Sequence, residues 1–186
     1  MSGENEGMSE ARRGYQRSAG GLAGAIVVSL LLIGAIWALR QISGGEAPDP
    51  APTIDYTETL TEARRNASFE VLAPEVVPPG WRATTARWVV EGDRELWHLG
   101  FVIDGGTDYV GLDQRTEPEK DALRVTTPAD QPKATVSVAG VTWKTFTTSD
   151  EDESALVLTG DGVTTIVSGT ASETVLRGFA ETLSPD

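Results

Sequence analysis

Hydrophobic and polar residues are distributed unevenly along the chain. Residues 19–39 read AGGLAGAIVVSLLLIGAIWAL, a run of 21 residues that has no charge and only Ser29 as a hydroxyl. At about 1.5 Å per residue, a helix of this length spans roughly 30 Å, the hydrocarbon thickness of a bilayer. The run has no polar face, and Trp37 lies near one end, where interfacial aromatic residues are typical. We therefore expect a transmembrane helix over residues 19–39.

The basic residues around this span predict its orientation. Arg12, Arg13 and Arg17 precede it, whereas Arg40 alone follows it closely. Basic residues favour the cytoplasmic side, so residues 1–18 are expected to form a polar cytoplasmic tail and the rest of the chain to lie outside the cytoplasm. A cleaved secretory signal is the alternative, although its apolar region normally runs to only about 7–15 residues. The predicted localisation is the cell membrane, with a single pass.

Small residues recur inside the predicted span. Gly21, Ala25 and Ser29 follow one another at intervals of four residues. This spacing allows two membrane helices to approach closely. A weak homodimer through these three residues is therefore a further expectation.

The region after the span reads as a linker and one domain. Residues 40–54 are rich in Pro and Gly, which is typical of an extended spacer. Residues 55–186 then show a helical pattern at 57–67, a Pro-rich turn, and alternating patterns typical of strands. The expected strands are residues 81–91, 94–103, 109–114, 135–138, 141–147, 155–159 and 163–168, with a long loop over 115–134.

Both ends of this domain carry signals for helices. Thr59 with Glu62, or Asp55 with Glu58, fits a capping box at the first helix, and Thr170 with Glu173 fits one at the last. The last helix has an apolar face formed by Val175, Leu176, Phe179 and Leu183. Strands in series between two helices predict an α+β fold: a mostly antiparallel sheet with the N-terminal and C-terminal helices packed on one face.

Composition and charge exclude several classes of function. The chain has 28 Asp+Glu, 15 Lys+Arg, one His and no Cys, which excludes thiol chemistry and Cys-ligated metals. Residues 41–186 hold 25 of the acidic and 11 of the basic residues, a net charge of −14. An acidic domain is unsuited to nucleic acid, so no nucleic-acid partner is expected. We also expect no cofactor, no metal site and no catalytic residue that the sequence can identify.

Three groups of polar residues are candidates for chemistry. His98 lies on the strand face opposite Trp97, Leu99, Phe101 and Ile103, so it is either a general base or ligand in a cleft, or simply a histidine on the sheet face. Trp81, Arg82, Arg87 and Trp88 form either a platform for an anion or sugar, or core tryptophans beside surface arginines. The acidic run at residues 150–153 is either a calcium site or a solvated loop. Asn66 also begins a glycosylation acceptor motif.

Short motifs in a fixed order resemble a known family. They are Leu72-Ala73-Pro74, Pro79-Gly80-Trp81-Arg82-Ala83, Trp97-His98-Leu99-Gly100, Tyr109-Val110, Gln114, Gly140-Val141-Thr142-Trp143 and Val167-Ser168-Gly169-Thr170-Ala171. With one N-terminal membrane helix, this order resembles the actinobacterial family called domain of unknown function 4245, over about residues 20–183. The resemblance implies a single-pass protein with an extracytoplasmic domain. It implies no activity. The order of Phe69, Val71, Pro74 and residues 78–81 also resembles other envelope α+β domains, which have a curved antiparallel sheet.

Three functions follow as hypotheses from these patterns. The first is a noncatalytic domain that binds or scaffolds a protein partner in the cell envelope. The second is a binding module for a small molecule or lipid, held in a pocket between the sheet and a helix. The third is a hydrolase that uses only carboxylates. For a binding site, we expect ligand contacts from a set of five residues: Trp81, Arg82, His98, Tyr109 and Gln114.

Overall fold

The computed structural model describes residues 52–185. The predicted tail, transmembrane span, dimer face and most of the linker lie outside the described residues. Among residues 52–185, no helix is both long and apolar enough to cross a membrane.

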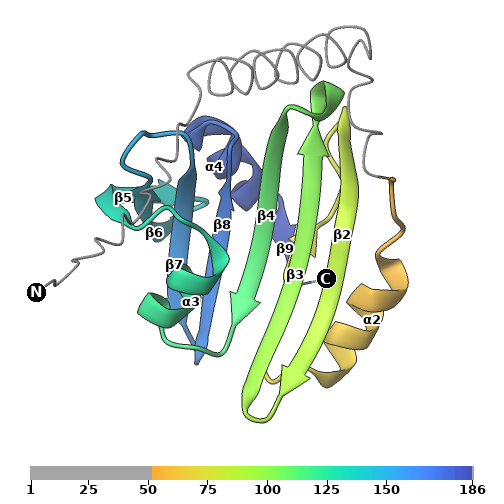
Figure 1. The fold of residues 1–186 in the computed structure, drawn as a ribbon. Helices are drawn as coiled ribbons and strands as arrows, with labels where there is room; N and C mark the ends of the chain where they lie inside the picture. The colour runs from red at the N-terminus through yellow and green to blue at the C-terminus, as the bar shows by residue number, and fades with distance from the viewer. Residues whose placement is uncertain (1–51, 186) are drawn as a thin grey trace, which may run out of the picture. The chain divides into compact units, whose positions relative to one another are not determined.

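The described residues form an α+β domain with three α-helices and a seven-stranded antiparallel sheet (Figure 1). Strands β1 and β9 form a separate two-stranded ladder. In chain order the elements are α2 (Thr57–Asn66), β1 (Ala73–Pro74), β2 (Trp81–Glu91), β3 (Arg94–Ile103), the 3-10 turn η1 (Asp104–Gly106), β4 (Asp108–Arg115), α3 (Glu119–Thr126), β5 (Gln131–Val138), β6 (Val141–Thr147), β7 (Ser154–Gly160), β8 (Val163–Gly169), α4 (Glu173–Glu181) and β9 (Leu183–Ser184).

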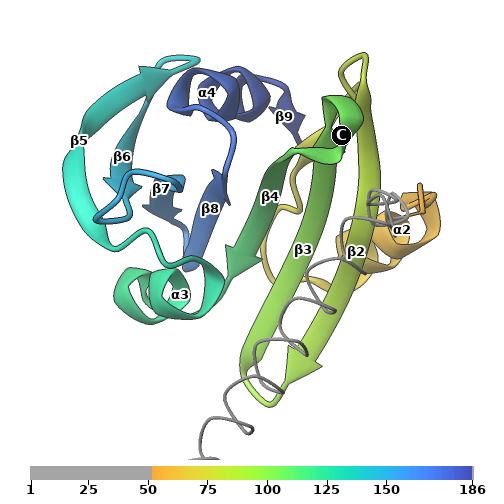
Figure 2. The ribbon, with the colours of Figure 1, turned by 45° about the horizontal axis from the view of Figure 1, so that its top comes forward.

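The large sheet consists of two meanders joined side by side. Its strand order is β2-β3-β4-β8-β7-β6-β5, and every neighbouring pair is antiparallel. After β4 the chain passes through α3 to the far edge of the sheet, then returns strand by strand until β8 pairs with β4. Figure 2 shows that the β5–β6 end curls away from the β2–β3 end, so the expected curvature is present.

The main hydrophobic core covers one face of the sheet, which we call the inner face. Trp97, Leu99 and Phe101 of β3 point into it and are fully buried. Ala63 of α2 and Phe179 of α4 close it from the other side. The predicted apolar row of β3 and the predicted terminal helices are therefore confirmed.

A second, smaller cluster lies on the opposite face, which we call the outer face. Ala122 and Leu123 of α3 pack there against Ala155, Val157 and Ile166 of β7 and β8. The expected loop over residues 115–134 is thus wrong, because this segment contains α3 and the first half of β5. The two predicted terminal helices, α2 and α4, do share the inner face, and α3 is an additional helix on the outer face that the sequence did not predict. The sequence of α3 shows too little apolar periodicity to predict a helix, because only two of its eight residues are core residues.

The helix caps differ from the predicted ones. Asp55 Oδ1 accepts hydrogen bonds from the backbone N–H and the hydroxyl of Thr57, at 2.9 and 2.7 Å, whereas Thr59 and Glu62 lie inside α2. At α4 the N-cap is Ser172, whose hydroxyl accepts from the N–H of Val175. The predicted cap Thr170 instead accepts a hydrogen bond from the backbone N–H of Tyr109.

Candidate functional site

His98 belongs to a polar cluster on the outer face of β3 and β4. Its Nδ1 lies 3.1 Å from Asp113 Oδ2, and its Nε2 lies 3.5 Å from the hydroxyl of Tyr109. His98 and Asp113 meet because the β3–β4 register places them directly opposite each other. An ionised carboxylate only accepts hydrogen bonds, so Nδ1 carries the proton in this pair. Both side chains are largely covered, at 11% and 7% exposed.

Tyr109 completes the cluster by lying flat over two glycines. Gly100 and Gly111 are opposite each other in the register, and a Cβ on Gly100 would stand only 2.7 Å from the Tyr109 oxygen. Burial and the nearby Asp113 carboxylate raise the pKa of Tyr109 to about 12, although Arg87 acts in the opposite direction. The phenol therefore keeps its proton to a higher pH than a free tyrosine does.

Arg115 connects this cluster to α3. Its Nε lies 3.8 Å from Asp113 Oδ1 and donates a hydrogen bond of 3.0 Å to the hydroxyl of Thr126. Its Nη1 lies 3.6 Å from Glu117 Oε1. Both ring nitrogens of His98 are thus engaged, and its carboxylate partner is shared with a guanidinium. The arrangement joins two strands and a helix, and it fits the alternative of a sheet-face histidine better than that of a general base.

Gln114 and Trp81 lie on the inner face instead. Gln114 is 1% exposed, and its amide accepts from the N–H of Leu72 at 2.7 Å and donates to the carbonyl of Glu70 at 3.0 Å. Trp97 Nε1 donates to the carbonyl of Leu72 at 2.8 Å. These bonds fasten residues 70–72 across the sheet. Trp81 stacks on Phe179, with ring centroids 5.4 Å apart.

The five predicted contact residues therefore do not converge. Arg82 is opposite Val102 and shares the outer face with His98 and Tyr109, whereas Trp81 and Gln114 share the inner face. The same alternation separates Trp81 and Trp88 from Arg82 and Arg87, so the proposed arginine–tryptophan platform does not form. Ligand binding by these residues stays a prediction, but the five side chains lie on two opposite faces of the sheet and cannot all line one site.

The sequence model of the family described as Protein of unknown function (DUF4245) matches residues 14–183. The chain belongs to this family. No curated protein matches the chain. The solved structure described as the crystal structure of MucB in complex with MucA(peri) is similar at 13% identity and a TM-score of 0.35, over 64% of this chain. The match spans 38% of the MucB chain, and at this TM-score it carries no functional argument.

The motifs that carry the DUF4245 resemblance now have structural roles. Trp97 and Gln114 hold residues 70–72 on the inner face, while His98, Gly100 and Tyr109 form the outer cluster. Asp113 was missed by the sequence reasoning. The turn between β3 and β4 could have revealed it, because extending the register back from that turn pairs position 98 with position 113.

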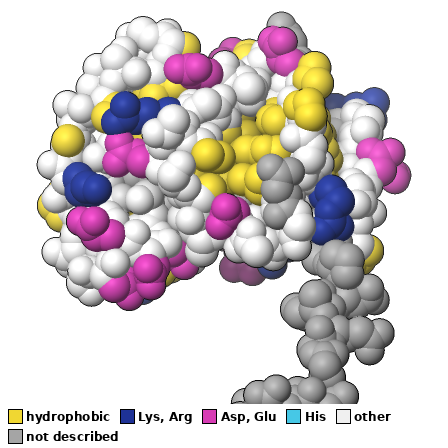
Figure 3. Space-filling model, turned by 90° about the horizontal axis from the view of Figure 1, so that it is seen from above, with side chains coloured by type: hydrophobic (Ala, Val, Ile, Leu, Met, Phe, Trp, Pro, Cys, Tyr) yellow, Lys and Arg dark blue, Asp and Glu magenta, His cyan; other side chains and the backbone are white. Residues whose placement is uncertain are grey.

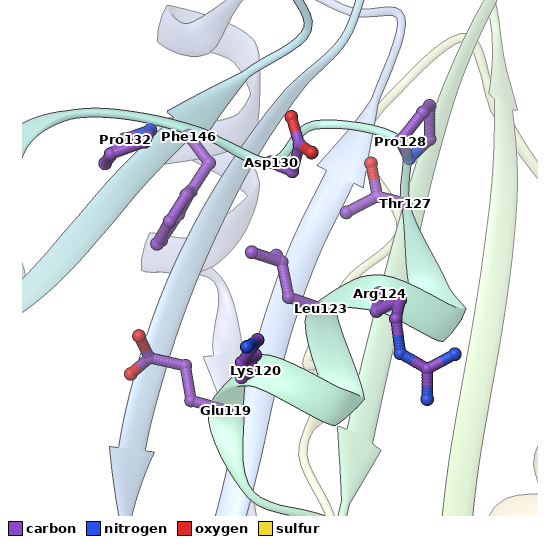
Figure 4. Close-up of a pocket in the computed structure, with 9 residues that line it drawn as sticks. All are labelled: Glu119, Lys120, Leu123, Arg124, Thr127, Pro128, Asp130, Pro132 and Phe146. Atoms are coloured by element: carbon purple, nitrogen blue, oxygen red, sulfur yellow. The ribbon is translucent and has the colours of Figure 1, made fainter.

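A cavity of about 520 Å³ in the DUF4245 domain lies between α3 and the start of the β5–β6 hairpin (Figure 4). Leu123 of α3 and Phe146 of β6 form its apolar wall, with Pro132 beside them. At its rim, Glu119 is paired with Lys144 at 2.8 Å and accepts a hydrogen bond from Thr159. The sequence reasoning missed this cavity because it predicted a loop where α3 forms.

A second cavity, of about 550 Å³, adjoins Gln114 on the inner face. Phe69 and Leu72 line it on one side, and Leu158 and Val163 at the β7–β8 end line it on the other. Of its polar lining residues, Gln114 is already hydrogen-bonded to the backbone of residues 70 and 72.

The other sequence candidates are placed in loops or at a helix end. Among residues 52–185, no group of three or more His, Asp or Glu residues is arranged to hold a metal ion. A hydrogen bond from the Thr148 side chain lowers the pKa of Asp150, and Asp150 also accepts from the backbone of Asp152, as in a solvated turn. Asn66 ends α2 and donates to the carbonyl of Glu62 at 2.8 Å, and its glycosylation stays a prediction.

Proposed function

We propose that this DUF4245 protein is a single-pass membrane protein whose α+β domain lies outside the cytoplasm and binds a protein partner of the cell envelope without catalysis. The uncharged run at residues 19–39 and the arginines before it support the anchor and its orientation. A weak membrane dimer through Gly21, Ala25 and Ser29 remains part of this proposal.

An apolar hollow at one end of the domain carries the proposal of a binding role. Figure 3 shows hydrophobic side chains gathered in a hollow on this end of the domain. Trp81, which stacks on Phe179, is only half-buried at this end of the sheet. Val76, on the loop that leads to Trp81, is 74% exposed. Contiguous apolar surface of this kind is typical of protein–protein interfaces.

Charge indicates the kind of surface that fits the hollow. Residues 41–186 carry a net charge of −14, so anionic lipid headgroups repel the domain. A protein that presents apolar side chains inside a basic rim is attracted by the same field. We therefore assign the hollow to a basic protein partner rather than to the bilayer surface.

Photo-crosslinking in the cells that produce the protein tests this proposal. A photoreactive residue at Val76 is expected to form one discrete adduct with an envelope protein. The matched control is Val90, another exposed valine at 54%, at the opposite end of β2. Equal adducts at both positions, or none at Val76, contradict the proposal. Protease accessibility of the domain on intact cells tests the topology, and a protected domain contradicts it.

The cavity between α3 and β6 favours a second candidate function, binding of a small molecule. Its volume of about 520 Å³ falls within the usual range for ligand sites, and its wall is apolar with charged groups at the rim. Native mass spectrometry of the purified full chain is expected to show a bound small molecule that Leu123→Trp displaces by filling the cavity. A bound species that persists in Leu123→Trp contradicts this assignment.

A further inference from the structure

Strand β5 is an open edge of the sheet. It is the last strand in the order and pairs only with β6. Six of its eight residues are exposed, and no other described backbone segment bonds to its outer side. An edge strand of this kind presents unpaired N–H and C=O groups that can accept another strand.

The register shows which residues present those groups. Ala139 and Gly140, both with positive φ (51° and 83°), form a two-residue turn between Val138 and Val141. Such a turn is closed by a hydrogen-bonded pair, and hydrogen-bonded and non-hydrogen-bonded pairs then alternate along the ladder. Val138 and Val136 therefore direct their backbone groups to β6. Those of Thr135 and Ser137 point to the open side.

The protection of this edge is confined to one end. Pro132, Lys133 and the bulge between residues 132 and 134 interrupt the first half of β5. Proline, lysine and bulges are the usual devices that prevent strands from adding to an edge. Residues 134–138 read ATVSV, which is β-prone and contains none of these devices.

The β5–β6 hairpin also differs from the rest of the domain in charge. Residues 131–148 contain no Asp or Glu, and their only charges are Lys133 and Lys144. Lys144 is already paired with Glu119. The strongly acidic domain thus has one edge hairpin from which acidic side chains are absent, so a strand can approach it without desolvating a carboxylate of the hairpin.

We propose that β5 binds an extended segment of a protein partner, which joins the seven-stranded sheet as an additional strand beside Thr135 and Ser137. This inference rests on the proposed function, because it assumes a protein partner. A second copy of the chain is disfavoured as the occupant, since residues 41–186 of each copy carry a net charge of −14. The partner segment carries no basic side chain opposite Lys133, because like charges across a strand pair are destabilising.

Proline substitution on the full chain, in its own cells, tests the outward backbone groups. Ser137→Pro removes an N–H that points away from β6, and proline is tolerated on that side of an edge strand. Ser137→Ala is the matched control, because it changes the side chain and keeps the N–H. A photoreactive residue at Thr142, opposite Ser137 on β6, reports the partner, which mass spectrometry identifies. Thr135→Pro provides a second, independent variant.

Strand addition predicts a discrete adduct from position 142 in the unaltered chain and in Ser137→Ala, and at least a tenfold loss in Ser137→Pro and Thr135→Pro. Melting curves that agree within a few degrees show that the variants are folded. An adduct that survives both prolines, or that Ser137→Ala also removes, overturns strand addition. If the unaltered chain forms no adduct from position 142 but still forms the adduct from Val76, strand addition is overturned and the proposed function stands. Absence of both adducts overturns both.

Discussion

The inner and outer faces of β3 and β4 use polar side chains in different ways. On the inner face, Trp97 and Gln114 reach out of the sheet to hold the backbone of residues 70–72, so polar atoms serve to attach a separate chain segment. On the outer face, His98, Tyr109 and Asp113 bond to one another across the two strands. Polar residues that are neighbours in one motif thus belong to two networks with the sheet between them.

This difference explains why a motif of chemically active residues need not be one site. Successive side chains of a strand point to opposite faces, so Trp97 and His98 separate at once, as do Asp113 and Gln114. The inner network is bonded to the backbone of a distant segment and stabilises the fold. The outer network bonds side chains of β3 and β4 to one another and reaches α3 through Arg115.

Removing the amide of Gln114 is the strongest test of this comparison. Gln114→Met keeps the side-chain volume but leaves the N–H of Leu72 and the carbonyl of Glu70 without their partner. We expect a loss of about 2 kcal/mol in the free energy of unfolding, because each buried group left unsatisfied costs roughly 1–3 kcal/mol. Urea unfolding of the isolated domain, whose hydrophobic clusters lie within residues 52–185, measures it.

The control for this prediction is Gln131→Met on the exposed edge strand, where surface changes usually stay within about 0.5 kcal/mol. Hydrogen exchange is expected to accelerate at residues 69–72 in Gln114→Met alone. Equal stability of the two variants would show that the inner network does not hold the segment.

A smaller effect is expected from crowding Tyr109 on the outer face. In Gly100→Ala the new Cβ would stand 2.7 Å from the Tyr109 oxygen and 3.1 Å from its Cε2, so the ring must shift. We expect a destabilisation of about 1–2 kcal/mol, in the range of overpacked sites. Tyr109→Phe removes the closest atom, so Gly100→Ala is expected to cost less in that background, with a coupling of at least about 0.5 kcal/mol.

Gly160→Ala serves as the control, because nothing lies within 4 Å of a Cβ built at that position. Additive effects of Gly100→Ala and Tyr109→Phe would contradict the close packing of the ring on the glycines. Denaturant unfolding of the four chains of the cycle provides the measurement.

Much of the sheet was predictable from local patterns. Strands β2 and β3 have the predicted limits, because Gly92 and Asp93 give a clear turn signal between two β-prone runs. Helix α3 was not predictable in the same way, since Ala122 and Leu123 are its only buried residues and prolines flank it. Its packing on the outer face depends on β7 and β8, which come later in the chain.

The candidate site was predictable only in part, for a related reason. The outward position of His98 followed from alternation within one strand, and Asp113 would have followed from the hairpin register. The partners of Gln114 would not have followed from any local pattern. Its amide bonds to Leu72 and Glu70, which lie 42 and 44 positions earlier in the chain. Contacts over such distances depend on how the loop after α2 folds across the sheet, and no local pattern encodes that path.

The last prediction concerns the alkaline titration of the outer network. Burial raises the pKa of Tyr109 from 10.0 to about 12. Between these two pH values the folded domain keeps a proton on Tyr109 that the unfolded chain loses. The contribution of Tyr109 to stability is therefore complete below pH 10 and falls as the pH rises toward 12.

Tyr109→Phe is expected to flatten this fall in stability and to remove the phenolate absorbance step that occurs at the highest pH. Tyr56→Phe is the control: burial also raises the pKa of Tyr56, but it packs against Phe101 on the inner face. If Tyr56→Phe removes the latest step instead, the more strongly shielded phenol lies on the inner face, and the outer network is more open to solvent than its geometry indicates.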